Sequence, residues 1–388
     1  MKNKYGSQLI SADDIEAVTS VLKSDFLTQG RGVPDFEKKV ATYCQSGFGV
    51  AFNSATSALH SCYLALGVGP NDIVWTVPNT FVATANAAIM AGANIDFIDV
   101  NSNTRNICID QLRMKLTEAE KAKKLPKVVA VVHFSGMSCD MKKIHELSEQ
   151  YHFKILEDAS HALGGTYDQK PIGNCQYSEM CVFSFHPVKM ITTGEGGLVT
   201  TNDSKYVDKL RLIRSHGVTR CSRMANRKLL SHEYDQIMLG YNYRMSDIAA
   251  VLGTSQMKKI EDFVECRNTL ANRYYDNLRE LPLRLPQKST ADQITSFHLY
   301  VIETMPETGS DRNKLMKYLQ SENIGVNLHY KPVHLQPYYQ QFGFATGDFN
   351  TAETYYKNCL SIPLHCKLTL SDIDEISDLI LNYFQKIL

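Results

Sequence analysis

The 388-residue sequence has no net charge, because 41 Lys and Arg residues balance 41 Asp and Glu residues. Without a basic excess, it is unlike a binder of nucleic acid or of anionic membranes. Long hydrophobic runs are also absent: the longest, such as residues 128–132, are far too short to span a bilayer. Residues 1–6 turn polar at once and have no apolar stretch of a secretion signal, so we expect a protein that is not secreted.

Cysteine pairs at a metal-binding spacing are missing as well. No two cysteines have the short separation of a zinc knuckle, and several lie inside apolar runs. We therefore expect buried free thiols of a reducing compartment, with neither a metal site nor a disulfide framework. The sequence predicts a cytoplasmic protein with no nucleic-acid partner and no membrane association. The cysteines are Cys44, Cys62, Cys108, Cys139, Cys175, Cys181, Cys221, Cys266, Cys359 and Cys366.

The first 250 residues alternate short apolar runs with helical periods. A hydrophobic content of 44% and a charged content of 21% are typical of a globular protein. Strand and helix in alternation predict an α/β fold with a mostly parallel sheet covered on both faces. Ligands then bind at the carboxyl ends of the strands. Strands are expected near 50–52, 73–77, 95–98, 128–132, 153–156, 180–183 and 198–200, with helices near 58–66 and 81–91.

The chain is long enough for two domains, and its pattern changes after about residue 250. A long helix at 261–278, a strand at 297–303 and a last helix from Ser371 predict a smaller α+β domain. We therefore expect a large domain at 1–250 and a small C-terminal domain at 251–388. Near the N-terminus, Ser11 can cap a helix with Ile15, Val18 and Leu22 on one face. No internal repeat or low-complexity linker interrupts this organisation.

Lys189 is the strongest candidate for chemistry. The apolar run 180–183 leads into the loop that holds this lysine, and glycines follow at 194–197. Desolvation in such a place lowers the pKa of a lysine, and its neutral amine can then condense with an aldehyde. A lysine in a loop is weak evidence alone, because most lysines are simply exposed.

Three further segments supply what a pyridoxal phosphate (PLP) site needs. Residues 53–59 join a strand to a helix start, which can cradle a phosphate, although an ordinary helix cap would have the same pattern. Asp158 follows a buried strand and can keep a pyridine nitrogen protonated, which makes the ring an electron sink. It could also merely cap the next turn, and His161 could be a satisfied core histidine. Phe81 could stack on a flat ring, but its periodicity alone favours a core residue.

Together these segments resemble the DegT/DnrJ/EryC1 group of sugar-nucleotide aminotransferases, which have the aspartate-aminotransferase fold (PLP fold type I). The resemblance covers nearly the whole chain. It is closest to the members of the pseudaminic-acid pathway that aminate C4 of a UDP-linked 4-keto-6-deoxy-N-acetylhexosamine. That closer similarity depends on His161, where many relatives have Gln, and on the Phe-His-Pro-Val-Lys stretch that ends at Lys189. The motifs lie at 53–59, 158–164, 183–197, 214–217, 240–247 and 328–332.

The resemblance implies a role for each matching residue. Lys189 bonds to the cofactor and later moves protons, Asp158 pairs with the pyridine nitrogen, and His161 lies near the phenolate oxygen. Phe81 stacks on the ring. The phosphate is held by Ser184, by the backbone of Ala55 and Thr56, and by Asn242 of a second subunit, which implies a homodimer with shared active sites. The nucleotide sugar is contacted by Tyr5, Asp25, Phe26, Leu27, Thr28, Leu328, His329, Tyr330 and Lys331.

One position beside the lysine departs from the pattern: Met190 replaces the His that is common in close relatives, so local polarity there is in doubt. The implied reaction moves an amino group from L-glutamate to the keto sugar. Alternatives are another UDP- or dTDP-linked keto sugar aminated at C3 or C4, a PLP-dependent sugar dehydratase, or a non-catalytic regulatory homologue. The dehydratases have His where this chain has Lys189. The intact lysine, aspartate and phosphate cradle argue against a non-catalytic role.

Overall fold

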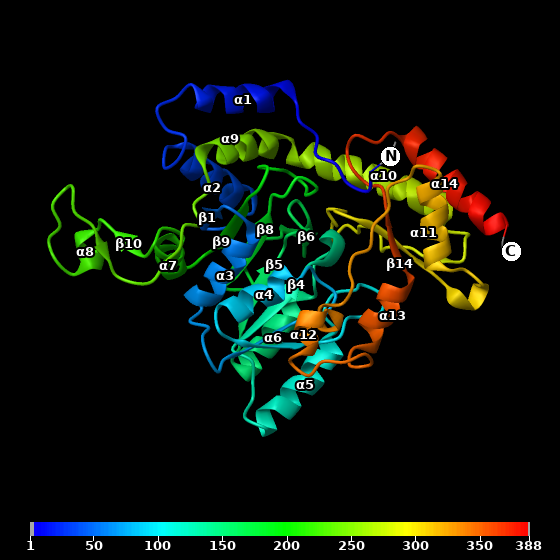
Figure 1. The fold of residues 1–388 in the computed structure, drawn as a ribbon, viewed down its shortest axis with the longest axis horizontal. Helices are drawn as coiled ribbons and strands as arrows, with labels where there is room; N and C mark the ends of the chain where they lie inside the picture. The colour runs from blue at the N-terminus through cyan, green and yellow to red at the C-terminus, as the bar shows by residue number, and fades with distance from the viewer. Residues whose placement is uncertain (1–3, 387–388) are drawn as a thin grey trace.

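A seven-stranded sheet forms the centre of the structure, a computed structural model that describes residues 4–386 (Figure 1). β9 is antiparallel to both of its neighbours, β1 and β8, and all other neighbouring pairs are parallel. Every strand except β9 therefore runs in one direction, and their carboxyl ends meet at one edge. The predicted mostly parallel sheet is confirmed. The strands in spatial order are β1 (Phe48–Phe52), β9 (Gly197–Thr201), β8 (Met180–Ser184), β5 (Lys154–Asp158), β4 (Val128–Val132), β2 (Ile73–Thr76) and β3 (Asn94–Phe97).

Helices cover both faces of this sheet, as the alternating pattern predicts. In β4, Val128 and Ala130 pack toward one face, whereas Val129 and Val131 pack toward the other. Because successive side chains of a strand point to opposite faces, a wholly apolar strand requires cover on both sides. One face carries α3 (Ala55–Ala65), α4 (Ala83–Met90) and α7 (Ser204–Arg214), and the other carries α2 (Gly32–Tyr43), α5 (Ile109–Lys121), α6 (Met141–Tyr151) and α9 (Asp247–Gln256).

The C-terminal part has a second, smaller sheet with its own apolar core. Its three antiparallel strands are β12 (Leu283–Arg284), β13 (Tyr300–Thr304) and β14 (Cys359–Ile362), packed with α10 (Ile260–Leu278), α11 (Arg312–Ser321) and α14 (Leu370–Gln385). The division at about residue 250 stays a prediction, and α9 spans that position. The segment with α12 (Pro337–Gln340) and α13 (Asn350–Asn358) returns to the large sheet, where Tyr339 and Phe349 pack on Phe97.

Several predicted boundaries shift for identifiable reasons. α3 starts at Ala55, earlier than predicted, because the Ser54 side chain accepts a hydrogen bond from the Ser57 amide and caps the helix there. β13 starts at Tyr300 instead of residue 297, because Phe297 has a φ of 47° and cannot continue an extended strand. The last helix starts one residue earlier than predicted, at Leu370, with Thr369 as its N-cap.

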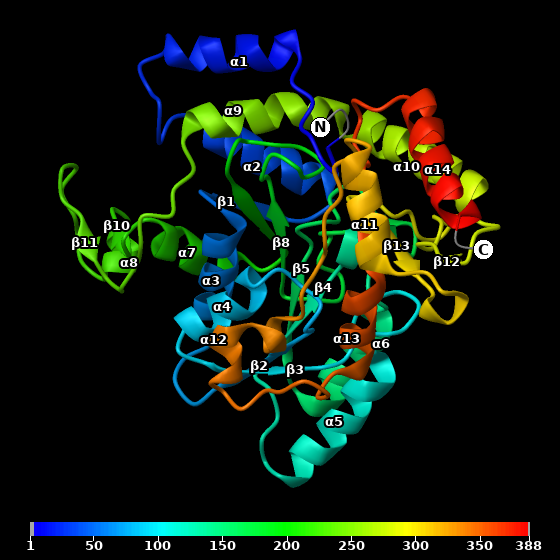
Figure 2. The same ribbon diagram turned by 45° about the vertical axis from the view of Figure 1, so that its right-hand side comes forward.

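Two elements lie outside the main body and expose apolar side chains. α1 (Ala12–Leu22) begins after its predicted cap, Ser11, but its apolar face is not buried: Ile15 is 61% and Leu22 57% exposed. The helix packs on α9 through the buried Asp14 carboxylate, which accepts hydrogen bonds from Gln256 and Lys259. An arm formed by β10 (Val218–Thr219), α8 (Ser222–Ala225) and β11 (Asp235–Gln236) projects away from the sheet (Figure 2). Both elements offer apolar surface that this chain alone does not cover.

All ten cysteines are unpaired thiols. The expectation that they are buried is wrong for Cys221, which is exposed because it lies on the projecting arm. Cys108, Cys266 and Cys366 are only partly buried. Within residues 4–386, no helix combines the length and apolarity that a membrane crossing requires. The same residues contain no cluster of three or more His, Cys, Asp or Glu side chains suited to a metal ion.

Candidate active site

A cavity of about 480 Å³ lies at the edge of the central sheet where the parallel strands end. The segments that follow β1, β2, β5 and β8 form its walls, together with residues 327–330 of the C-terminal part. This position agrees with the expectation that ligands bind at the carboxyl ends of the strands. The predicted site residues that line it are Tyr5, Ala55, Thr56, Phe81, Asp158, His161, Ser184, Lys189, Leu328, His329 and Tyr330.

The start of α3 forms an anion-binding corner of this cavity. The first amides of a helix have no intrahelical acceptor, and the Ser54 cap uses the amide of Ser57, so those of Ala55 and Thr56 remain available. Gly197 on β9 packs directly against this corner: a Cβ there would lie 2.6 Å from the Ala55 nitrogen. Only glycine permits that approach. The hydroxyl residue Ser184 at the end of β8 completes the corner, which is suited to a phosphate.

The carboxylate of Asp158 is held rigidly at the end of β5. Its Oδ2 accepts a hydrogen bond of 2.6 Å from the Thr84 hydroxyl. Its Oδ1 accepts one of 2.6 Å from the Ser160 hydroxyl and one of 3.1 Å from the Ser160 amide. The bond to the Ser160 amide is the local turn contact that the capping interpretation predicts, but Asp158 also lines the cavity. Both interpretations therefore apply, and the capping contact helps to orient a carboxylate that faces the cavity.

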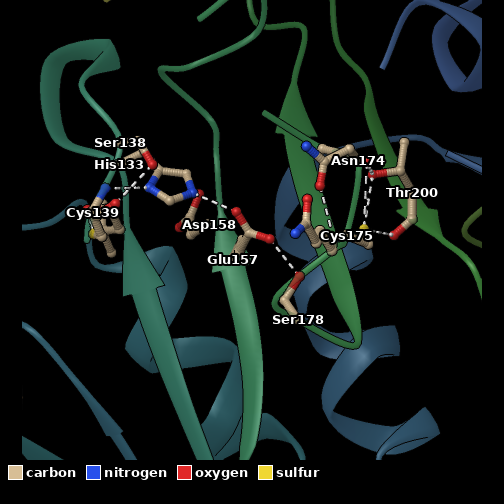
Figure 3. A network of polar contacts seen from close by, with 12 residues as sticks. His133, Ser138, Cys139, Glu157, Asp158, Asn174, Cys175, Ser178 and Thr200 are labelled. Carbon is tan, nitrogen blue, oxygen red and sulfur yellow. Dashed lines mark hydrogen bonds and ion pairs between the residues drawn. The ribbon is translucent and has the colours of Figure 1, made fainter. Parts of the chain in front are cut away.

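A buried polar network fixes β5 behind Asp158 (Figure 3). Glu157 alternates to the other side of the strand, where it accepts hydrogen bonds from His133 Nε2 at 2.7 Å and from the Ser178 hydroxyl. His133 Nδ1 accepts the amide of Cys139 at 3.0 Å, so the ring proton resides on Nε2 and points at Glu157. The amide of His133 also donates to the Asp158 carbonyl. β4 and β5 are thus cross-linked at the point where Asp158 enters the cavity.

Lys189 lies in the loop after β8 and also lines the cavity. Burial lowers the pKa of its amine to about 8, and the negative charge of Asp158 opposes this effect only in part. A larger fraction of the amine is therefore neutral at physiological pH than for an exposed lysine. Met190 is buried and, with Lys189 and Thr192, borders a second, much smaller space. The presence of Met190 in place of the common His therefore changes the polarity of that smaller space and not of the main cavity.

His161 is a buried histidine whose two ring nitrogens are both hydrogen-bonded. Nδ1 accepts from the Ser135 amide at 3.3 Å, which leaves the proton on Nε2, 3.1 Å from the Tyr330 hydroxyl. Burial, followed by the charge of Lys189, lowers its pKa well below the usual range, so the ring is neutral. The imidazole of His298 packs against it at a tilt of 43°, with ring centroids 4.4 Å apart. His161 is therefore satisfied as a core histidine would be, but it also lines the cavity.

Phe81 does not behave as the core residue that its periodicity allows. Its side chain is 60% exposed, lines the cavity, and lies 6.2 Å from the ring of Tyr330 between centroids. An exposed aromatic ring at a cavity wall is available to stack on a planar ligand.

Some predicted residues do not reach the cavity of their own chain. Asn242 is exposed and lies outside its lining. Residues 25–28 are also exposed and lie outside it. Lys331 follows Tyr330 but is not among the lining residues. Residues 25–28 and Lys331 are therefore the residues predicted to contact the sugar that the cavity of the same chain does not include.

Sequence reasoning missed Thr84, Ser160 and His298. The first two hold Asp158, and the third packs against His161. Thr84 and Ser160 lie inside or beside segments that the sequence analysis singled out. The sequence around a Ser or Thr on a helix or turn does not show which group its hydroxyl will bond. His298 is 137 residues from His161 along the numbering, so no local pattern marks their contact.

The arrangement fits pyridoxal phosphate. One cavity combines a helix start for the phosphate, a fixed carboxylate for the ring nitrogen, an exposed aromatic ring and a lysine with a lowered pKa. These are the polar and apolar groups that the cofactor requires.

Comparisons with known proteins agree with this geometry. The model of the DegT/DnrJ/EryC1/StrS aminotransferase family matches residues 8–381. The chain is 37% identical to the UDP-4-amino-4,6-dideoxy-N-acetyl-beta-L-altrosamine transaminase of Campylobacter jejuni, with 99% of this chain and 98% of that protein covered. Among solved structures it is similar to Helicobacter pylori PseC, an aminotransferase involved in the biosynthesis of pseudoaminic acid, at 30% identity and a TM-score of 0.89, with 99% of each chain covered. It is also similar to the PLP form of Spr1654 from Streptococcus pneumoniae, described as a sugar aminotransferase, at 27% identity and a TM-score of 0.91, with 100% of each chain covered. The chain therefore belongs to the DegT/DnrJ/EryC1/StrS aminotransferase family and is a pyridoxal-phosphate-dependent transaminase.

Proposed function

We propose that this transaminase moves an amino group from L-glutamate to C4 of UDP-2-acetamido-2,6-dideoxy-β-L-arabino-hex-4-ulose, giving UDP-4-amino-4,6-dideoxy-N-acetyl-β-L-altrosamine, a step of pseudaminic-acid biosynthesis. The observation that carries the proposal is the full-length similarity to the Campylobacter jejuni transaminase of that product, at 37% identity. The similarity to Helicobacter pylori PseC supports the same substrate. The presence of Lys189 and Asp158 in one cavity supports the reaction type.

The bound cofactor supplies an electron sink for the bond that breaks at the donor carbon. Asp158 keeps the ring nitrogen protonated through a charge-assisted hydrogen bond. Thr84 and Ser160 hold the carboxylate in place before the cofactor arrives, so the interaction requires little reorganisation. The neutral His161, with Nε2–H directed to Tyr330, adds a polar group near the ring oxygen without adding a positive charge.

Lys189 carries the protons. Its amine would remove the proton from Cα of glutamate; the amino group would stay with the cofactor, and one water would supply the keto oxygen of the released 2-oxoglutarate. In the second half of the cycle the sugar would lose its keto oxygen as water and take up the amino group, and Lys189 would return a proton to C4. A pKa of about 8 suits a group that must act as base and as acid near neutral pH. Phe81, exposed at the cavity wall, stacks on the cofactor ring, and Ser184 with the amides of Ala55 and Thr56 binds the phosphate.

The active unit is a homodimer with shared active sites. The exposed Asn242 completes the phosphate site of the neighbouring subunit, and residues 25–28 contact its nucleotide sugar. Exposed apolar side chains on α1, on residues 26–27 and on the projecting arm support a second copy as the cover for this surface. The unpaired thiols support a location in the reducing cytoplasm.

A substrate panel tests the reaction. Purified protein is incubated with glutamate and each of several UDP- and dTDP-linked 4-keto and 3-keto sugars, and the new C–N bond is located by NMR. We expect the highest kcat/KM for the UDP-linked 4-keto-6-deoxy-N-acetylhexosamine with amination at C4. A higher kcat/KM for a dTDP-linked sugar, or amination at C3, would contradict the proposed substrate.

Subunit mixing tests the shared site. Lys189→Ala and Asn242→Ala proteins, each inactive alone, are allowed to exchange subunits. If Asn242 acts across the interface, a mixed dimer has both lesions in one site and an intact second site, so activity returns. If no activity appears after verified subunit exchange, the cross-subunit role of Asn242 is refuted.

A further inference from the structure

Asp247 links the start of α9 to the segment between α1 and α2. Its side chain is buried, with an exposed fraction of 2%. Oδ2 accepts a hydrogen bond of 2.7 Å from the Gly30 amide, and Oδ1 accepts one of 3.1 Å from the Val33 amide. The amide of Asp247 donates to the Leu27 carbonyl at 2.9 Å. One residue therefore holds three points of the segment 27–33.

One of these three hydrogen bonds stabilises the start of α2. The N-cap of that helix, Arg31, makes no side-chain capping bond, and the Asp247 carboxylate accepts the Val33 amide in the first turn instead. A negative charge at this end is stabilising, because unpaired amides and the helix dipole are positive there. The contact leaves no free space: a Cβ at Gly32 would lie 2.7 Å from Asp247 Oδ1.

The other two bonds lie outside the helix and act on the loop. Leu27 and Gly30 precede α2, and the four side chains at 25–28 are exposed, with Phe26 63% exposed. Side-chain packing within the chain therefore does little to fix the shape of this loop. Its backbone is held by two hydrogen bonds with Asp247: the Gly30 amide donates to Oδ2, and the Leu27 carbonyl accepts from the Asp247 amide.

Along the chain, Asp247 lies five residues after Asn242. That segment is anchored to the large sheet, since the amide of Asn53 donates to the Tyr243 carbonyl at 2.9 Å and Met245 is buried. Asp247 thus connects the exposed segment 25–28 to the segment that carries the exposed Asn242. Both are absent from the cavity of their own chain.

We propose that Asp247 is a positioning residue for the nucleotide-sugar site of the partner subunit. It fixes the loop 25–28 in the shape that this site requires, and it acts through that loop without touching the substrate. The proposal rests on the shared active sites of the proposed function and adds to them the residue that sets the loop.

The first test separates positioning from a purely structural role. Asp247→Ala loses both carboxylate acceptors, and hydrogen bonds to a charged group are strong enough for a change of about tenfold or more in binding. We expect KM for the nucleotide sugar to rise at least about tenfold, with the rate of the glutamate half-reaction near that of wild type. Asp35→Ala is the matched control, because Asp35 is an exposed carboxylate in the first turn of the same helix. It should leave KM unchanged.

A second variant guards against misfolding of Asp247→Ala. Gly30→Ala keeps the carboxylate, but its methyl group would lie 2.9 Å from the Phe26 Cβ and must displace the loop. It should raise KM for the sugar in the same way. If both variants are folded, with melting curves close to that of Asp35→Ala, and both have wild-type KM, the proposal is overturned.

Subunit exchange decides on which site Asp247 acts. In a mixed dimer of Asp247→Ala and Lys189→Ala, the subunit with the intact lysine receives its loop from a subunit with intact Asp247. We expect activity with wild-type KM to appear on mixing. A mixed dimer that retains the high KM would show that Asp247 acts within its own subunit and would overturn the proposal. Return of activity in the Asn242→Ala mixture alongside that result would leave the shared site intact, whereas no return of activity in the Asn242→Ala mixture would remove the shared site itself.

Discussion

Replacing Thr84 by valine tests whether the rigid hold on Asp158 contributes to turnover. The substitution keeps the shape of the side chain and removes the hydroxyl that donates a 2.6 Å hydrogen bond to Asp158 Oδ2. Both residues are buried. A hydrogen bond to a charged group contributes about 1.5–3 kcal/mol. At 1.36 kcal/mol per factor of ten, that range corresponds to a loss of roughly 10- to 150-fold in kcat.

The lower end of the range is expected, because the hydroxyl and amide of Ser160 still hold Oδ1. Single-turnover reaction with glutamate, followed by the change in cofactor absorbance, measures the effect directly. Thr76→Val is the matched control: Thr76 is also buried and donates its hydroxyl to the Ala130 carbonyl at 2.8 Å, outside the cavity. It should lower the free energy of unfolding by about 0.5–1.5 kcal/mol and leave kcat unchanged. If Thr84→Val turns over within twofold of wild type while remaining folded, the proposed hold on the carboxylate has no catalytic role.

Three further outcomes are expected. Lys189→Ala should bind the cofactor only non-covalently and lose essentially all turnover, and borohydride reduction of wild type followed by peptide mapping should label Lys189; a label on another lysine would contradict its role. Asp158→Asn keeps the shape but removes the charge, so kcat should fall by orders of magnitude, and a near-normal rate would mean that the carboxylate only caps a turn. Because burial lowers the pKa of Lys189 to about 8, covalent attachment of the cofactor to the apoprotein should accelerate as the pH rises toward 8 and level off above it, since only the neutral amine reacts. A stopped-flow rate that is flat from roughly pH 6 to 9 would disagree with that pKa.

The sequence by itself determined the features that depend on neighbouring residues. The alternation of apolar runs and helical periods indicated a mostly parallel sheet with ligands at the strand ends, and the structure confirms the sheet. Lys189, Asp158 and the start of α3 were identifiable because each lies at the end of a buried strand or in the loop after it, and parallel strands bring their carboxyl ends to one edge. Ser11 was identifiable as a helix cap for the same reason, since a cap acts within one turn.

Only the tertiary structure decided which distant residues meet. Thr84 contacts Asp158 across 74 residues, and Tyr330 contacts His161 across 169. The sheet places β5 between β4 and β8, an order that periodicity does not encode. Periodicity also gives the apolar face of a helix without saying what covers it, which is why the exposed face of α1 was not predicted. The exposure of residues 25–28 and their attachment to Asp247 likewise depend on how α9 crosses α2, because those contacts join residues more than 200 positions apart.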